Sequence, residues 1–176
     1  MEEIVIKITD IFTPEIRKKL EKLCLENKLE VTFKYISDFK STWLLRNYVS
    51  ELCSMCGLDK TWISRITLVT DELNNNAIEY WSKAWEYNKM IFKLKKDWEY
   101  KNIEIIVEDT WNWKWHKTAS EMEKLREQKL KNWFDDHNSI RWRGLFLIIE
   151  KLADELVFED SDSWGLRVIV RKKIKD

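Results

Sequence analysis

A carboxylate and an amide, Glu72 and Asn76, stand four residues apart in a segment with helical periodicity. In a helix over about 61–82, these two side chains would lie on one face, beside the apolar stripe and at the rim of the core. An amide oxygen can ligate Mg²⁺, and a carboxylate at such a rim can accept a proton from an attacking hydroxyl or water. The same pair is common on ordinary solvated helix faces, so its meaning depends on its surroundings. The stripe that predicts the helix consists of Ile63, Ile66, Leu73 and Ala77.

A second carboxylate, Asp109, ends a segment with strand-like alternation. Ile103, Ile105 and Val107 occupy alternate positions, which predicts a strand over 101–109 with one buried face. Asp109 is in phase with them, so its side chain should point toward the core, where a carboxylate must find a hydrogen-bond donor. That donor can belong to a helix end, to a basic side chain or to a ligand, and the strand alone leaves these alternatives open.

Tryptophans occupy the positions that follow this carboxylate. Trp111 and Trp113 come directly after Asp109. Trp142 precedes a strongly apolar helix predicted over 143–153. The chain has 11 tryptophans and 3 glycines among its 176 residues, whereas ordinary usage predicts about 12 glycines. The two counts together are therefore close to the glycine content expected of a chain of this length.

We hypothesise that most of these tryptophans are glycine in the natural protein, because the codon UGA specifies tryptophan in some bacterial genetic codes and glycine in others. Glycine at 111 and 113 would let the backbone turn sharply and approach a ligand closely. Glycine at 142 would leave the first N–H groups of the next helix free for phosphate oxygens, and Arg143 would add a charged contact. The alternative is a core rich in tryptophan, which fits poorly at Trp98 because this residue stands in a predicted polar hairpin turn.

With glycine at these positions, three segments together resemble the motifs of the GHKL (histidine-kinase-like) ATPase family. Within that family, the chain is similar to the small bacterial anti-sigma-factor serine kinases. The order and spacing of the three motifs make the resemblance specific, and it covers residues 29–173. The matching segments are Asp71–Ile78 for the N box, Asp109–Trp113 for the first glycine box and Trp142–Ile148 for the second, with Leu152–Glu155 similar to the anti-sigma group.

The resemblance implies ATP and Mg²⁺ as cofactors. It places Glu72 at the general-base position, Asn76 at the Mg²⁺ ligand and Asp109 where the family binds the adenine amino group. Two positions depart from the pattern: Tyr80 stands where the kinase group often has histidine, and Leu166 stands where many relatives have threonine beside the adenine. The second departure leaves the adenine contacts open. The other residues implied in cofactor binding are Trp111, Trp113, Trp142, Arg143, Gly144 and Leu145.

The predicted elements follow one another in an order typical of an α+β two-layer sandwich. A mixed, mostly antiparallel sheet with helices on one face explains the clean alternation of the strands, and the resemblance implies a Bergerat-type ATP-binding fold. We predict an N-terminal strand–helix extension over 1–28 and a histidine-kinase-like ATPase domain over 29–176, with a poorly packed lid at 110–141. The remaining predicted elements are strands at 3–9, 29–35, 89–96, 155–160 and 165–173, a helix that begins at Thr13-Pro14, and a helix at about 40–56.

The composition restricts the partners and the compartment. The 31 basic and 31 acidic residues cancel, so no net field attracts nucleic acid or an anionic membrane, and we expect neither as a partner. The sequence has no apolar run long enough to span a bilayer and no signal-peptide pattern at its start, which predicts a cytoplasmic protein. The odd number of cysteines, Cys24, Cys53 and Cys56, favours buried thiols on helix faces over disulfides or a metal site.

These observations predict an ATP-binding anti-sigma or partner-switching regulator. We expect an Mg²⁺-dependent serine/threonine protein kinase of the GHKL type whose partner is a sigma factor, an anti-sigma antagonist or both, and a homodimer is compatible with this function. Two other functions remain open, a non-catalytic ATP-binding interaction module and the catalytic ATPase subunit of a two-component-type system. If the tryptophans are genuine, the chain would instead be a relative with a blocked site.

Overall fold

The computed structural model describes residues 4–7, 13–82, 86–109, 117–131, 146, 151–161 and 165–175. The first half of the chain contains β1 (Ile4–Lys7), α1 (Pro14–Leu25), β2 (Leu29–Ile36), α2 (Phe39–Met55), α3 (Lys60–Asn76) and η1 (Ala77–Trp81). The second half contains β3 (Tyr87–Lys96), β4 (Tyr100–Glu108), α4 (Ala119–Lys131), β5 (Glu155–Asp160) and β6 (Leu166–Lys175). The element η1 is one π-helical turn that continues α3.

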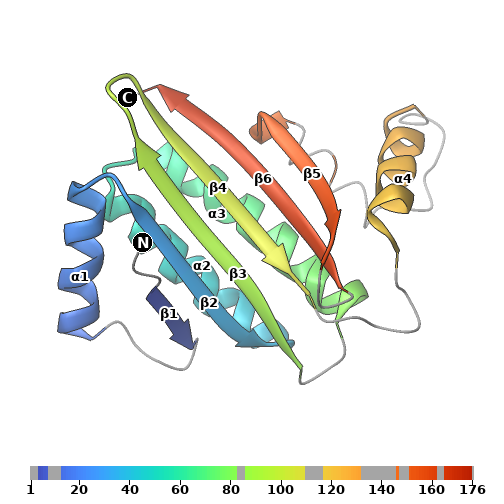
Figure 1. Ribbon diagram of the computed structural model, residues 1–176, viewed down its shortest axis with the longest axis horizontal. Coiled ribbons are helices and arrows are strands. Elements are labelled where there is room, and N and C mark those ends of the chain that lie inside the picture. Colours follow the sequence, from blue (N-terminus) through green and yellow to red (C-terminus); the bar gives the residue numbers. More distant parts are fainter. Residues whose placement is uncertain are drawn as a thin grey trace.

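Six strands form one sheet in the order β1-β2-β3-β4-β6-β5. Strands β1 and β2 are parallel, and every other neighbouring pair is antiparallel. Helices α2 and α3 lie across one face of this sheet (Figure 1). The predicted α+β two-layer sandwich, with a mixed, mostly antiparallel sheet, is therefore confirmed.

The core lies between the sheet and the helices α2 and α3. On β4, Ile103, Ile105 and Val107 are 3 %, 1 % and 0 % exposed. On α3, Ile66 and Leu73 are buried in the same cluster. The strand alternation and the helical stripe that predicted these elements are therefore the two surfaces that pack together, and this contact places the polar residues of α3 and β4 at one end of the core.

Aspartates cap the beginnings of both core helices. Asp38 Oδ1 accepts a hydrogen bond from Lys40 N at 3.2 Å, and Asp59 Oδ1 accepts one from Thr61 N at 2.8 Å. Each cap satisfies a backbone N–H that has no partner within its own helix. Because the caps determine where α2 and α3 begin, they also determine which residues reach the far ends of these helices.

The elements of the predicted extension, β1 and α1, pack onto the rest of the chain. Strand β1 continues the sheet beside β2, and Leu20 of α1 is fully buried in the common core cluster. Cys24 and Cys56 form a disulfide between the ends of α1 and α2, with their Cα atoms 5.3 Å apart. The prediction of free thiols is therefore wrong for this pair, because packing brings the two helix ends within disulfide reach. Cys53 is a buried free thiol as predicted, while the boundary at residue 28 stays a prediction.

The charged segment after β4 contains a helix that packs against the core. Thr118 N donates to Glu121 Oε2 at 2.8 Å, and Glu121 N donates back to Thr118 Oγ1 at 3.3 Å. These reciprocal bonds form a capping box that begins α4. Met122 of this helix is fully buried. Met122 is the only buried residue among those of 117–131 whose burial is described, so the expectation of poor packing over 110–141 stays a prediction, and the remainder of that segment lies outside the described residues.

The sheet face opposite α2 and α3 carries two rows of ion pairs that cross the strands. The first ladder consists of Glu30, Lys93, Glu104, Arg171 and Glu155, and the second of Lys89, Glu108, Arg167 and Glu159. Between the two ladders, Thr32, Ile106 and Ile169 are at most 8 % exposed. The charges thus pair within each ladder, and the buried row separates the two ladders.

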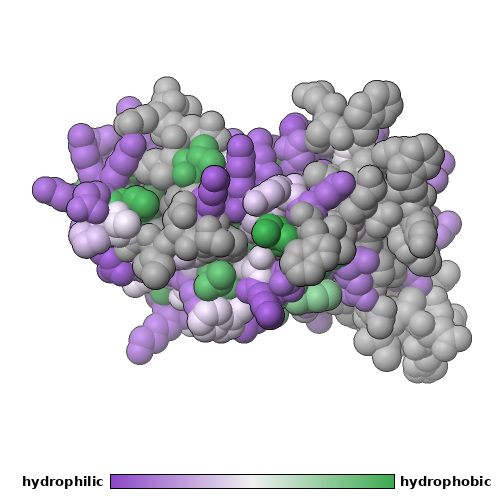
Figure 2. All heavy atoms as spheres, turned by 90° about the horizontal axis from the view of Figure 1, so that it is seen from below, coloured by the Kyte–Doolittle hydropathy of each residue, from purple (hydrophilic) through white to green (hydrophobic). Residues whose placement is uncertain are grey.

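Hydrophilic side chains dominate the described surface when the molecule is seen from below the view of Figure 1, and exposed apolar side chains are scattered among them (Figure 2). Trp98 and Leu25 are the most exposed of the large apolar residues that the structure describes, at 90 % and 84 %. Within the same described ranges, every helix is too short or too polar to cross a bilayer.

Candidate functional site

Asp109 lies directly after β4 on the core side of the sheet, as its phase predicts, and is only 2 % exposed. Its Oδ1 accepts a hydrogen bond from Leu166 N at 2.9 Å, and its own N–H donates to Leu166 O at 3.2 Å. Its Oδ2 is buried and, within the described part of the chain, has no hydrogen-bond partner. Burial raises the pKa of Asp109 to about 8. The site thus contains a buried carboxyl group whose charged form is disfavoured and which has one unused oxygen.

Gly165 lies against Asp109 at the beginning of β6. A Cβ at Gly165 would stand 2.2 Å from Asp109 O and 2.5 Å from Asp109 Oδ1. Ser161 N donates to Gly165 O at 2.9 Å, which links the end of β5 to the same point. Only glycine fits this position, because a methyl group would push Asp109 away from its backbone partner.

Polar side chains from β2, β3 and α3 form a buried cluster inside the core. Tyr35 OH donates to Asn74 Oδ1 at 2.5 Å, and Tyr35 stands opposite Asn88 in the pairing of β2 with β3. Ser82 Oγ donates to Asn88 Oδ1 at 2.5 Å. Asn88 lies close enough to Tyr35 to counteract part of the rise in its pKa, while Asn88 Nδ2 makes no hydrogen bond to any described residue. The cluster therefore contains an unused donor.

The register of β3 and β4 connects this cluster to Asp109. Lys89 pairs with Glu108, so Asn88 and Asp109, the residues just beyond this pair, are neighbours at the ends of adjacent strands. Burial raises the pKa of Tyr35 well above its ordinary value, and the charge of Asp109 adds to the shift. Sequence reasoning missed Tyr35 and Asn88. The signal that could have found Asn88 is its phase with the apolar residues of β3.

Glu72 and Asn76 lie in the last turns of α3. Asn76 is 5 % exposed, and its Nδ2 donates to Glu72 O one turn earlier, a bond that does not use Oδ1, the atom able to ligate Mg²⁺. Glu72 is partly buried, and burial followed by the nearby charge of Asp71 raises its pKa. Asn74, between the two, makes the bond to Tyr35. The end of α3 thus meets the same end of the core as Asp109.

Asp71 connects α3 to α2 beside Glu72. Its Oδ2 accepts a hydrogen bond from Arg46 Nε at 2.6 Å. Its Oδ1 is buried with no hydrogen-bond partner among the described residues. The ion pair fixes the first residue of the predicted N box, and the negative charge that it holds next to Glu72 favours the protonated form of that carboxylate.

Six of the predicted cofactor-binding residues lie outside the described residues, so their roles stay predictions. They are Trp111, Trp113, Trp142, Arg143, Gly144 and Leu145. Trp98 can be examined. Asp97 Oδ1 accepts from Glu99 N at 3.0 Å and from Tyr100 N at 2.7 Å, and the positive φ values in the described chain are at Asn27 and Gly57. The hairpin turn therefore forms without a glycine-only conformation at 98.

Comparisons with known proteins address the fold. No protein-family model matches the sequence, and no curated protein matches it significantly. Among solved structures, the chain is similar to one in the crystal structure of the SiaB–SiaC complex from Pseudomonas aeruginosa, with a TM-score of 0.54 and 11 % sequence identity. The match covers 92 % of this chain and 99 % of that one. At this identity, what the two chains have in common is the fold.

Proposed function

We propose that this protein binds ATP at the Asp109 end of its core and regulates a protein partner, as an anti-sigma or partner-switching kinase would. The observation that carries the proposal is the unused oxygen of Asp109, because a buried carboxyl group without a partner is costly unless a ligand satisfies it.

The residues around Asp109 fit an adenine amino group. This amino group is a hydrogen-bond donor, and Oδ2 is the carboxyl atom left to accept it, since Oδ1 already accepts from Leu166 N. A donor placed at Oδ2 would favour the ionised carboxylate and lower its pKa from about 8. Glycine at 165 leaves the space that the carboxyl group needs in this orientation. Nucleotide binding should therefore release a proton near neutral pH.

The transfer of a phosphoryl group is assigned to the end of α3. Glu72 would accept the proton of a serine or threonine hydroxyl of the partner, a task for which a pKa raised toward the working pH is suitable. Asn76 Oδ1 would hold Mg²⁺, with the amide orientation fixed by the bond from Nδ2 to Glu72 O. When bound, Mg²⁺ would neutralise the charge that develops on the transferred phosphoryl group.

A protein partner is supported by the structural neighbour, which was crystallised as part of a complex named for two proteins. The balanced net charge of this chain supports the same class of partner, because it provides no general attraction for polyanions. A sigma factor or an anti-sigma antagonist is our proposal for that partner.

The test is a titration with a fluorescent ATP analogue and Mg²⁺. It uses both the printed chain and its glycine form, in which all eleven tryptophans are replaced by glycine. In whichever of the two forms binds the ATP analogue, Asp109→Asn should weaken this binding by roughly tenfold or more, because the substitution replaces an acceptor of a charge-assisted hydrogen bond by an amide. The control variant Glu21→Gln removes one negative charge from exposed α1, outside the predicted lid, and should leave binding unchanged.

Phosphate transfer is tested separately from binding. Candidate partner proteins that co-purify with the chain are incubated with labelled ATP. Glu72→Gln should abolish transfer while ATP binding and partner binding persist. Transfer that survives Glu72→Gln would refute the assigned base, and ATP binding that is equal in the Asp109→Asn and control variants would refute the nucleotide site.

A further inference from the structure

A third polar row on the open face of the sheet differs from the two ion-pair ladders. Lys95 of β3 pairs with Asn102 of β4, and Asn102 pairs with Lys173 of β6. In the two ladders, acidic and basic residues form ion pairs with N···O distances of at most 3.9 Å. The third row has an amide between two lysines and contains no carboxylate.

The carboxylates closest to this row are bound to other groups. Asp97 Oδ1 accepts from two backbone N–H groups of the hairpin, and its Oδ2 accepts from Asn102 Nδ2 at 3.1 Å. Asp154 Oδ1 accepts from Lys172 Nζ, and its Oδ2 from Lys173 N, both at 2.6 Å. Asp97 does lie near the charge of Lys173, but its oxygens accept from the N–H groups of the turn and from the Asn102 amide, and from neither lysine of the row. Positive charge therefore remains in excess at the row.

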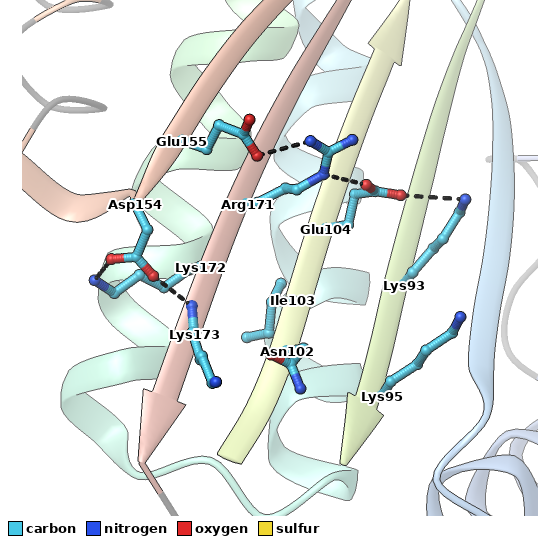
Figure 3. A pocket seen from close by; sticks show the side chains of 10 residues that line it. All are labelled: Lys93, Lys95, Asn102, Ile103, Glu104, Asp154, Glu155, Arg171, Lys172 and Lys173. Carbon is cyan, nitrogen blue, oxygen red and sulfur yellow. Dashed lines mark hydrogen bonds and ion pairs between the residues drawn. The ribbon is translucent and has the colours of Figure 1, made fainter. Parts of the chain in front are cut away.

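The ammonium groups of the row remain available. Within the described residues, Lys95 is exposed and its Nζ makes neither an ion pair nor a hydrogen bond. Lys173 Nζ lies 4.0 Å from the centre of the Tyr100 ring, a contact that leaves its N–H donors largely free. Figure 3 shows Lys95 and Lys173 on either side of Asn102.

The row lies in a hollow of about 320 Å³ on the sheet surface. Five of its ten lining residues are basic and three are acidic, and the acidic ones are Glu104, Asp154 and Glu155, each of which pairs with a basic residue of the same hollow. Lysine and arginine side chains also carry aliphatic stems, which can contact apolar parts of a bound peptide. The hollow thus offers carbon surface for a peptide and cations for its acidic side chains.

We propose that this hollow is the docking place for an acidic segment of the protein partner, with its carboxylates bound by Lys95 and Lys173. Charge complementarity identifies the occupant, because the charges of the two ladders are paired within each ladder, whereas Lys95 and Lys173 of the hollow form no ion pair with any described residue. The inference deepens the proposed function by naming the kind of partner segment. The open face of the sheet lies opposite α2 and α3 (Figure 1), so the partner would dock without covering the site at Asp109.

The test measures binding of a fluorescein-labelled polyglutamate peptide to the full chain by anisotropy, without nucleotide and at about 20 mM salt, where exposed charges are weakly screened. The double variant Lys95→Gln/Lys173→Gln should weaken binding by roughly fivefold, the effect expected of two exposed ion pairs. The matched control, Lys18→Gln/Lys60→Gln, removes the same charge from exposed positions on α1 and α3 and should bind as the parent does.

A second readout locates the peptide directly. Carbodiimide coupling joins a bound carboxylate to the nearest lysine, and peptide mapping should find the joined residues at Lys95 and Lys173. Equal loss of affinity in the two double variants, coupling at unrelated lysines, or no binding at low salt would each overturn the inference. Asp109→Asn should leave peptide binding intact, so failure here is distinguishable from failure of the nucleotide site.

Discussion

Asp109 combines features that a solvent-exposed aspartate lacks. One oxygen is fixed by Leu166 N, the other is buried without a partner among the described residues, and the missing side chain of Gly165 lets Asp109 lie this close to the chain that enters β6. Because burial penalises the charged form, the pKa is raised to about 8. A ligand that donates a hydrogen bond to Oδ2 would reverse this penalty, so the residue can couple nucleotide binding to release of a proton.

We predict that Asp109→Asn changes the pH dependence of stability. The folded state has a pKa of about 8 at this residue against an ordinary 3.8, so between these values it binds more protons than the unfolded state does. The contribution of Asp109 to stability is therefore present at acidic pH and is lost as pH rises toward 8. Asparagine does not titrate. The free energy of unfolding of the variant, minus that of the parent, should rise by about 2–4 kcal/mol between pH 5 and pH 8.

Urea unfolding at a series of pH values checks this prediction. Parallel curves for parent and variant would contradict it, and would mean that Oδ2 is hydrated enough to ionise normally. Glu127→Gln on α4 serves as the control, because its side chain is exposed and its removal should leave the pH dependence unchanged.

At the scale of elements, the sequence was sufficient to predict a strand or helix wherever one face of that element is buried. Strand β5 has the predicted bounds, 155–160, and the periodic residues of β4 and α3 form the core. The sequence was insufficient to predict an element whose buried face is small, or the contacts made where two distant elements meet. Helix α4 buries Met122 within a mostly charged sequence, so its periodicity is weak. The neighbours of Asp109 on β2 and β3 follow from strand register, which no local pattern determines.

The disulfide between α1 and α2 should contribute measurably to stability. Its two cysteines are 32 residues apart, and closing a loop of that length in the unfolded chain corresponds to about 3–4 kcal/mol in the loop-entropy model. We predict that Cys24→Ser lowers the free energy of unfolding by about 3 kcal/mol. Adding a dithiol reductant should destabilise the parent by a similar amount and leave the variant unaffected.

Urea unfolding with and without reductant measures both effects. Cys53→Ala is the control for cysteine removal as such: it should still respond to reductant, because Cys53 takes no part in the bond. An unchanged free energy of unfolding of the parent protein after addition of reductant would contradict the prediction.

At the scale of the whole molecule, the most unusual feature of the chain is its content of eleven tryptophans. Of the three whose side chains are described, Trp98 and Trp43 are 90 % and 63 % exposed, which is unusual for the largest apolar side chain. Trp62 is partly buried and lies within 5.3 Å of the Lys172 ammonium and closer to Arg65. Loss of exposed indoles should cost little stability, so glycine is compatible with the fold at the surface positions.

We predict that the printed chain binds ATP poorly and that the glycine form binds it in an Mg²⁺-dependent manner. Indoles at 111, 113 and 142 would occupy space that phosphates and a closely approaching backbone require. Titration of both proteins with the fluorescent analogue is the measurement. Equal and tight binding by the two chains would mean that the tryptophans are genuine. Reading the codons at the eleven positions provides an independent check.

The Cys24–Cys56 bond closes a covalent ring that contains all of β2 and α2. A peptide bond broken anywhere inside this ring would produce a nicked molecule and no free fragment. The N-terminal strand β1 and helix α1 would therefore stay attached to the sheet after scission, although two new chain ends would be present. A break in the linker of Ser37 and Asp38 between β2 and α2 would thus leave one molecule for as long as its surroundings keep the bond oxidised.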